Sequence, residues 1–309
     1  MKRILTVLSL GLLIAGLGLG CRKPKTVDKT IVSSELMATA DKQMKQGKFA
    51  EARLTLRQLE QYLPGSPEFP KAKLMLGDSF FFQSSPSFPE AEVEYTSFLN
   101  YFPRHELRDY ALYHRALCHF SSIESAERDQ TETRKALEGF QQLLAESPGS
   151  PYAGEAKAKV VQCWRRIAEH ELVVGVFYVN VYYYPGAEQR LKALLETYPD
   201  YVDRERAYFY LGEAMRQRLL SREEVAQYEK DYAAKLQKED LKTLTREQGE
   251  QFTKDFTAFT TDRIKSFRDE ARSYYQKLVE SYPGSEWARR AADRLVTMGA
   301  DGVKEELDS

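Results

Sequence analysis

Five prolines are surrounded by the same pattern of small and large residues, and this repeat constrains the fold more than any other feature. Each proline has one alanine twelve residues before it and another eight residues after it. A recurring register of this kind is typical of chains built from one repeated structural unit. The prolines with their two alanines are Pro64 (Ala52, Ala72), Pro103 (Ala91, Ala111), Pro148 (Ala136, Ala156), Pro199 (Ala187, Ala207) and Pro283 (Ala271, Ala291).

Large apolar residues stand four and seven positions after the first alanine of every unit. These spacings place them on one face of a helix, where the small alanine allows a neighbouring helix to approach closely. The proline then ends the helix, and a Gly-Ser turn in three units precedes the next one. The apolar residues are Leu56, Tyr95, Phe140, Leu191 and Tyr275 at the first position, and Leu59, Phe98, Leu143, Leu194 and Leu278 at the second.

Two units also carry Leu-Gly in their second helix, at Leu76-Gly77 and Leu211-Gly212. Together with the alanine, the apolar residues and the proline, this matches the tetratricopeptide (TPR) signature. The sequence therefore predicts an all-α fold, a superhelical array of about five TPR-like helix pairs with a concave surface suited to extended peptides or partner helices. The prolines lie 39, 45, 51 and 84 residues apart, so the units are irregular.

The longest interval between prolines predicts an insertion near the C-terminus. Apolar residues recur there at helical steps, and 12 basic and 12 acidic residues between Arg216 and Glu270 indicate solvated helices. We expect a long helical hairpin over about residues 218–262, inserted into the fifth repeat. A partner-binding arm and a solvated hairpin packed on its own repeat are alternative interpretations. A polar capping helix should follow and end at Gly299.

The first twenty residues predict a secretory signal peptide. Lys2 and Arg3 precede an uncharged apolar run that ends in small residues. This run, residues 4–20, has 17 residues, at the short limit for a membrane span, so a permanent transmembrane helix is the weaker alternative. The Gly20-Cys21 junction resembles the cleavage and lipidation site of bacterial lipoproteins, although Gly18 stands where that site prefers leucine. An ordinary signal peptide is the alternative for Cys21.

Removal of residues 1–20 leaves 43 basic and 46 acidic residues, a net charge of −3, which does not favour a generic nucleic-acid binder. Residues 22–30 are basic and contain Pro24, as expected of a flexible tether beside an anionic lipid surface. The predicted organisation is a signal peptide (1–20), a lipidated cysteine and tether (21–32), N-terminal and central repeats (33–200), a C-terminal repeat with hairpin and capping helix (201–299) and a tail (300–309).

No motif predicts an enzyme, a metal site or a cofactor site. His114, Cys118 and His119 share a helical spacing, but two further ligands are missing, so a core cysteine beside polar-face histidines is expected. Cys118 and Cys163 hold equivalent positions in successive repeats, farther apart than a disulfide allows. We expect free, buried thiols. The aromatic run at residues 177–184 predicts a helix buried on most sides, with a hydrophobic docking patch as the alternative.

The segment from Arg166 to Asp200, RIAEHELVVGVFYVNVYYYPGAEQRLKALLETYPD, resembles the most recognisable part of the BamD (ComL) family, the lipoproteins of outer-membrane β-barrel assembly. That family combines a lipidated cysteine, five irregular TPR units, a long helix ending in paired tyrosines, and an arginine-bearing helix leading to Tyr-Pro-Asp. Here Arg190 and Tyr198-Pro199-Asp200 match, and the long helix would span residues 151–183. The resemblance covers about residues 33–216 and resumes at Phe267; the hairpin and the last helix depart from short family members.

The resemblance implies a scaffold without catalytic activity, anchored by lipid on the periplasmic face of the outer membrane. Arg22 after the cysteine implies outer-membrane sorting. Its partners would be a POTRA domain of the barrel protein BamA, other lipoproteins of the β-barrel assembly (BAM) machinery, and unfolded outer-membrane proteins. Expected BamA contacts are Arg190, Tyr198 and Asp200, with Arg190 foremost because arginine pairs bidentately with carboxylates.

By the same resemblance, a groove in the N-terminal repeats would receive the C-terminal strand signal of unfolded outer-membrane proteins. Candidate rings for that groove are Tyr62, Phe69, Tyr95 and Tyr113, and core packing is the alternative for each. Other periplasmic TPR scaffolds, of the Tol-Pal-associated type or serving as adaptors for cell-wall enzymes, are the competing functions. The Tol-Pal type usually has a coiled coil before its repeats and no acylated cysteine.

Overall fold

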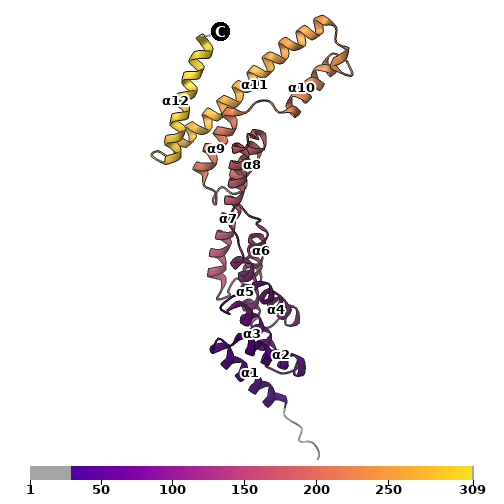
Figure 1. The fold of residues 1–309 in the computed structure, drawn as a ribbon, viewed down its shortest axis with the longest axis vertical. Coiled ribbons are helices and arrows are strands. Elements are labelled where there is room, and N and C mark those ends of the chain that lie inside the picture. Colours follow the sequence, from indigo (N-terminus) through magenta and orange to yellow (C-terminus); the bar gives the residue numbers. More distant parts are fainter. Residues whose placement is uncertain (1–28, 308–309) are drawn as a thin grey trace, which may run out of the picture. The chain divides into compact units, whose positions relative to one another are not determined.

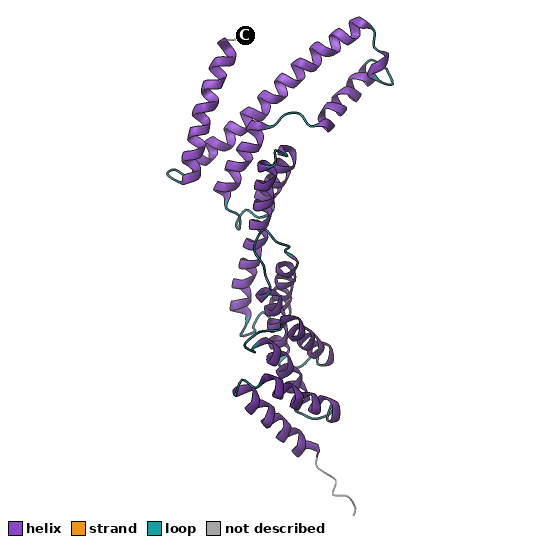
Figure 2. Cartoon of the chain, viewed as in Figure 1, coloured by secondary structure: helices purple, strands orange, loops and turns teal. Residues whose placement is uncertain are grey.

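The computed structural model describes residues 29–307, with side chains from Thr30 to Gly299. The signal peptide, Gly20, Cys21 and residues 22–28 of the tether lie outside this range. Within it the chain forms twelve α-helices and one short 3-10 helix, with no β-strand (Figures 1 and 2). None of these helices is long and apolar enough to cross a membrane. The predicted all-α fold class is confirmed.

The chain divides into two compact units, one ending at Ala72 and one beginning at Lys73. The first contains α1 (Lys29–Lys45), α2 (Phe49–Tyr62) and the start of α3 (Phe69–Phe81). Helix α1 begins before residue 33, where the repeats were expected to start. It packs against α2, and the Ser33 hydroxyl donates a 2.5 Å hydrogen bond to Glu68, just before α3.

In the second unit each helix from α4 to α9 packs on the next, and α9 packs on α11, which packs on α12. The long α7 matches the expected long helix, although it is shorter than residues 151–183 at both ends. The bounds are α4 (Phe88–Tyr101), α5 (Arg108–Ser121), α6 (Thr131–Glu146), α7 (Ala153–Asn180), α8 (Tyr184–Thr197), α9 (Arg204–Gln217), α10 (Arg222–Lys235), η1 (Leu241–Thr243), α11 (Arg246–Ser281) and α12 (Glu286–Leu307).

The predicted repeat register forms the core. All ten alanines and all ten large apolar residues of the pattern are at most 1% exposed. In every repeat the helix before the proline ends two residues ahead of it, as at Tyr62 before Pro64. This is the expected effect of proline on the residue that precedes it.

The Leu-Gly motif has a packing role. A Cβ atom on Gly77 would lie 2.6 Å from the ring of Tyr95, so only glycine lets this ring reach the backbone of α3. The Tyr95 hydroxyl then donates a 2.7 Å hydrogen bond to Asp78, the residue after the glycine. We call this arrangement the glycine–acid–tyrosine unit.

The fifth repeat contains the same unit. A Cβ atom on Gly212 would lie 2.5 Å from the ring of Tyr275, and the Tyr275 hydroxyl donates a 2.6 Å hydrogen bond to Glu213. The partner helix is the C-terminal part of α11, where Phe267, Ala271, Tyr275 and Leu278 are buried. The fifth helix pair is therefore α9 with the end of α11.

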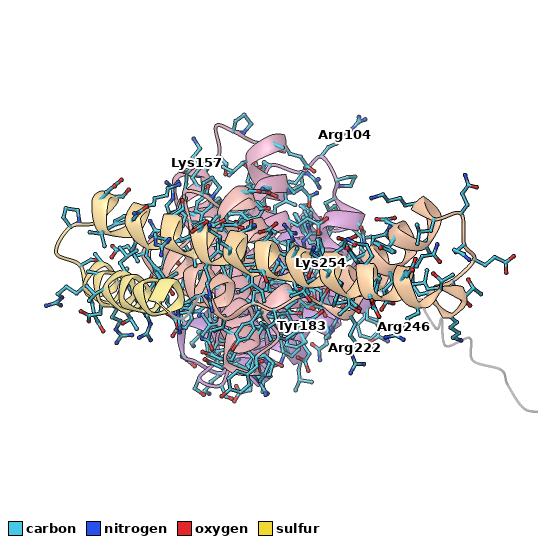
Figure 3. All side chains as sticks on the ribbon, turned by 90° about the horizontal axis from the view of Figure 1, so that it is seen from above. Arg104, Lys157, Tyr183, Arg222, Arg246 and Lys254 are labelled. Atoms are coloured by element: carbon cyan, nitrogen blue, oxygen red, sulfur yellow. The ribbon has the colours of Figure 1, made fainter. Side chains whose placement is uncertain are left out.

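Between these two partners lies the expected hairpin, formed by α10, η1 and the N-terminal part of α11. Aromatic rings hold it together: Tyr228 stacks on Phe259 at 4.4 Å between ring centroids, and Tyr232 meets Phe252 edge-on at 5.0 Å. Many of its exposed side chains are charged, including Arg246 and Lys254, which Figure 3 labels. The hairpin continues into the fifth repeat without a break, because α11 is one helix of 36 residues.

Helix α12 differs from the expected capping helix. It continues past Gly299 to Leu307 instead of ending at the glycine, and it includes most of the expected tail. Glycine inside a helix costs only about 1 kcal/mol relative to alanine, and no proline follows to force a stop. Cys118 and Cys163 are free and buried, as expected.

Candidate functional site

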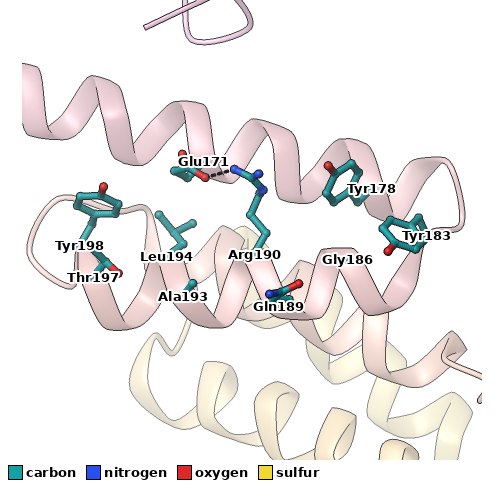
Figure 4. Close-up of a pocket in the computed structure, with 10 residues that line it drawn as sticks. All are labelled: Glu171, Tyr178, Tyr183, Gly186, Gln189, Arg190, Ala193, Leu194, Thr197 and Tyr198. Atoms are coloured by element: carbon teal, nitrogen blue, oxygen red, sulfur yellow. Dashed lines mark hydrogen bonds and ion pairs between the residues drawn. The ribbon is translucent and has the colours of Figure 1, made fainter. Parts of the chain in front are cut away.

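Helices α7 and α8 line a groove of about 480 Å³ that contains two of the three expected BamA contacts (Figure 4). The two helices approach closely because Gly175 of α7 has no side chain: a Cβ atom there would lie 2.5 Å from Leu191 of α8. Three tyrosines, one arginine and one glutamate give the groove its chemistry. The lining residues are Glu171, Tyr178, Tyr183, Gly186, Gln189, Arg190, Ala193, Leu194, Thr197 and Tyr198.

Arg190 is the only cation among these lining residues, and it forms an ion pair with Glu171 across the groove. Its guanidinium also lies 5.9 Å from the centroid of the Tyr178 ring. The Arg190 side chain is 35% exposed, whereas the Glu171 side chain is 20% exposed. The carboxylate therefore lies deeper than the guanidinium, which keeps donors available to a partner's carboxylate.

The turn between α7 and α8 presents an aromatic surface. The Tyr182 and Tyr183 side chains are 76% and 56% exposed, and Phe177 is 56% exposed. Within the aromatic run, residues 177–184, only Val179 is buried. The expectation of a helix buried on most sides is therefore wrong, because α7 ends at Asn180 and the last residues of the aromatic run leave the helix.

The three expected BamA contacts separate in the structure. Arg190 and Tyr198 line the groove, and Tyr198 packs on Trp164 at 5.7 Å between ring centroids. Asp200 follows in the turn to α9, outside the groove, with a side chain that is 84% exposed. It lies 4.0 Å from Arg204, at the limit of an ion pair.

The four expected substrate rings do not form one surface. Tyr62 is 66% exposed, whereas Phe69, Tyr95 and Tyr113 are buried. Tyr95 packs on Gly77, and the Tyr113 hydroxyl donates a hydrogen bond to Glu155. Core packing, the alternative for each ring, therefore describes these three.

The histidine and cysteine cluster has structural partners. His114 Nδ1 lies 3.0 Å from the Tyr110 carbonyl oxygen, and burial holds the pKa of His114 below its usual value. His119 pairs with Glu132 at 2.7 Å, and burial raises the pKa of the Cys118 thiol to about 12. Among the side chains that the structure describes, no three His, Cys, Asp or Glu residues gather as metal ligands would.

Residues 29–232, about two thirds of the chain, match the YfiO family, described as outer membrane lipoprotein, and residues 268–285 match a tetratricopeptide repeat. The outer membrane protein assembly factor BamD of Vibrio cholerae is 28% identical over 200 residues, covering 62% of this chain and 82% of the relative. BamD of Caulobacter vibrioides is 27% identical over 201 residues, covering 65% of this chain and 65% of the relative.

A solved tetratricopeptide repeat protein from Parabacteroides merdae aligns with 90% of this chain and 77% of its own, at 17% identity and a TM-score of 0.32. The sequence matches confirm the resemblance of residues 166–200 to BamD, and the helix pairs supply the repeats that the resemblance implies. The chain belongs to the YfiO family of outer membrane lipoproteins, the family of the BamD assembly factors.

Proposed function

We propose that this protein is a non-enzymatic scaffold of outer-membrane protein assembly. It would be anchored by lipid at Cys21 on the periplasmic face of the outer membrane and would act with other BAM lipoproteins. The groove between α7 and α8 would hold a POTRA domain of a BamA-like barrel protein. The observation that carries this proposal is the placement of Arg190, which is about one third exposed, paired with the deeper Glu171 and beside tyrosine rings.

Arginine and tyrosine are the residue types that dominate protein interfaces, and an arginine whose internal partner lies deeper can pair with a second carboxylate. Tyr198 and the exposed Asp200 would extend this contact towards α9. We propose that unfolded outer-membrane proteins meet the N-terminal repeats, where Tyr62 is the exposed aromatic candidate. The substrate would be held weakly enough to be released.

The test is co-purification of the barrel protein with the Arg190→Glu variant. The new carboxylate would repel both Glu171 and an acidic partner surface, so the barrel protein should be lost from the complex. Arg166→Glu is the matched control, because Arg166 lies on α7 outside the groove and also pairs with a glutamate, Glu169. The Arg166 side chain is 36% exposed, close to the 35% of Arg190. Recovery of Tol-Pal or cell-wall proteins in place of a POTRA-bearing barrel would contradict the proposal.

A charge exchange separates a contact with the partner from an internal role. Combining Glu171→Arg with Arg190→Glu rebuilds the internal ion pair in reverse. If Arg190 touches the partner, the exchanged protein should fold normally and still fail to co-purify. Full recovery of the complex in the exchanged protein would show that Arg190 acts only within this chain.

A further inference from the structure

A second groove lies on the other side of the α7 end, and it shares no lining residue with the first. It has a volume of about 520 Å³ and is formed by the end of α7, by α9 and by α12. Helix α9 packs against both α7 and α12, which brings the three elements together (Figure 1). We call it the α12 groove; it is lined by Val179, Asn180, Tyr182, Phe209, Tyr210, Glu213, Gln217, Arg290, Asp293 and Arg294.

Aromatic rings form one wall of the α12 groove. Phe209 and Tyr210 of α9 lie 5.2 and 5.8 Å from the Trp287 ring of α12, centroid to centroid. The Arg290 guanidinium lies 4.7 Å from the same Trp287 ring. An apolar residue of a partner would therefore meet aromatic surface beside a cation.

In the α12 groove the glutamate is buried and the arginines lie nearer to solvent. Glu213 has a side chain only 9% exposed, and its carboxylate accepts hydrogen bonds from Tyr275, Arg216 and Arg294. Although burial acts in the opposite direction, these bonds hold the pKa of Glu213 below its usual value. The carboxylate is thus fully engaged inside the protein.

The arginines lie nearer to solvent. Arg294 uses its Nε to bind Glu213, which leaves its terminal nitrogens to other acceptors, and its side chain is 43% exposed. Arg290 is 50% exposed and pairs with the more exposed Glu286, an i,i+4 pair of the kind worth only a few tenths of a kcal/mol. Asp293 is the remaining carboxylate at the groove. Because Glu213 is engaged inside the protein, the exposed charges among the lining residues are two arginines against one carboxylate.

Tyr182 stands at the rim in a conformation that favours glycine. Its φ is +62°, and the Tyr183 and Tyr182 amides donate hydrogen bonds to the carbonyls of Tyr178 and Val179, the pattern that ends many helices. The same pattern ends α1 with Gly47. Tyr182 is 76% exposed, and a tyrosine in this conformation stabilises the turn less than glycine would.

We propose that the α12 groove is a second docking site, which takes a protein segment carrying acidic side chains next to an aromatic or large apolar residue. The carboxylates would pair with Arg290 and Arg294, and the apolar side chain would pack against Tyr182 and Tyr210. Helix α12 lies outside residues 29–232, so three of the ten lining residues, including both arginines, belong to a part of the chain that the family match does not cover.

The experiment uses the full-length protein in mild detergent and fluorescence anisotropy. The probe is an end-blocked, labelled peptide that alternates glutamate and phenylalanine, and a matched peptide carries glutamine in place of glutamate. We expect the acidic peptide to bind at least about tenfold more tightly, the ratio expected for charge-assisted hydrogen bonds. Arg290→Gln should weaken it by about the same factor.

Tyr182→Gly gives the sharpest contrast, because it should weaken binding of the acidic peptide by about tenfold or more while the Tm stays the same or rises. Arg246→Gln is the control, since Arg246 forms a similar i,i+4 pair on α11 with a side chain 92% exposed. Arg190→Glu should also leave peptide binding unchanged, which separates this proposal from the function of the first groove.

Three results would overturn the proposal. The first is equal affinity, or no measurable affinity, for the acidic and the glutamine peptides. The second is acidic-peptide binding that neither Tyr182→Gly nor Arg290→Gln weakens. The third is an absence of peptide binding together with Arg290-dependent binding to phosphatidylglycerol vesicles, which would assign the arginines to a lipid surface.

Discussion

One buried carboxyl group of the repeat core, that of Asp78, should make the stability of the fold depend on pH. Asp78 follows Gly77 in the second unit of the chain and accepts hydrogen bonds of 2.7 Å from the hydroxyls of Tyr95 and Tyr110. Burial raises the pKa of Asp78 to about 6, although both hydrogen bonds act to lower it. The tyrosines can donate to the carboxyl in either protonation state, so the cost of burying its charge remains.

The sign of the effect follows from this raised pKa. The folded state binds the Asp78 proton more tightly than the unfolded state does, so this group's contribution to stability falls as pH rises from about 4 to about 6. Asp78→Asn keeps an acceptor for the hydroxyls and cannot ionise. As pH rises over that range, the free energy of unfolding of the variant should therefore increase relative to that of the wild type, by a total on the order of 3 kcal/mol. Urea denaturation at each pH measures this difference.

His114 lies near the same rings, and burial lowers its pKa. Its contribution to the stability of the fold is therefore lost as pH falls below 6.5, the usual pKa of histidine. It is present in both proteins, so it cancels in the difference between them. A difference in the free energy of unfolding that stays constant across this pH range would contradict the assignment to Asp78.

At the scale of elements, the hairpin is held at two places. The aromatic rings join α10 to α11, and at the base Arg218 joins three helices. Arg218 pairs with Glu188 of α8 and, at 2.9 Å, with Glu224 of α10, while its guanidinium lies 4.2 Å from the centroid of the Phe267 ring. The base should therefore stay ordered when the outer part of the hairpin is loosened.

Phe259→Ala tests this division. Loss of the stacked contact with Tyr228 should lower the free energy needed to open α10 by about 1–2 kcal/mol. Amide exchange in α10 should then be roughly five- to thirtyfold faster. Hydrogen exchange followed by mass spectrometry should show no change in α7 or α8. Thr257→Ala, at an exposed position on the same helix, is the control. Equal acceleration in α8 would contradict the division.

The helix pairs could be predicted from the sequence because alanine, large apolar residues and proline recur at fixed distances. Which aromatic rings lie at the surface could not be predicted from the sequence. Tyr95 and Tyr198 are the same residue type, and only their positions relative to neighbouring helices place one in the core and the other in the groove. The exposed aromatic turn was only the alternative interpretation of residues 177–184, because α7 ends through Tyr182, with no glycine to signal the end. The α12 groove joins residues that lie more than a hundred positions apart.

At the scale of the whole molecule, the family match and the N-terminal sequence address different parts of the chain. Residues 29–232 match an outer membrane lipoprotein family, and the proposed lipid attachment at Cys21 lies before them. A lipid anchor would hold the repeats at the membrane without a spanning helix, by burying acyl chains at about 0.8 kcal/mol per CH₂ group.

Cys21→Ser should abolish palmitate labelling and release the protein from the membrane fraction. Cys163→Ser is the matched control, because that thiol is buried and its burial raises its pKa to about 11, so it offers little reactive thiolate. Labelling that survives in the Cys21→Ser protein would exclude lipidation at this residue.

The glycine–acid–tyrosine unit also limits which substitutions this sequence can accept. A side chain added at Gly212 meets the Tyr275 ring, and a smaller residue in place of Tyr275 leaves a void and removes a hydrogen bond to Glu213. Each single step away from the unit is therefore costly, while a joint replacement of all three residues need not be. Related chains should keep the three residues together in a repeat or lose them together, and a survey of such chains would show this as covariation within each repeat.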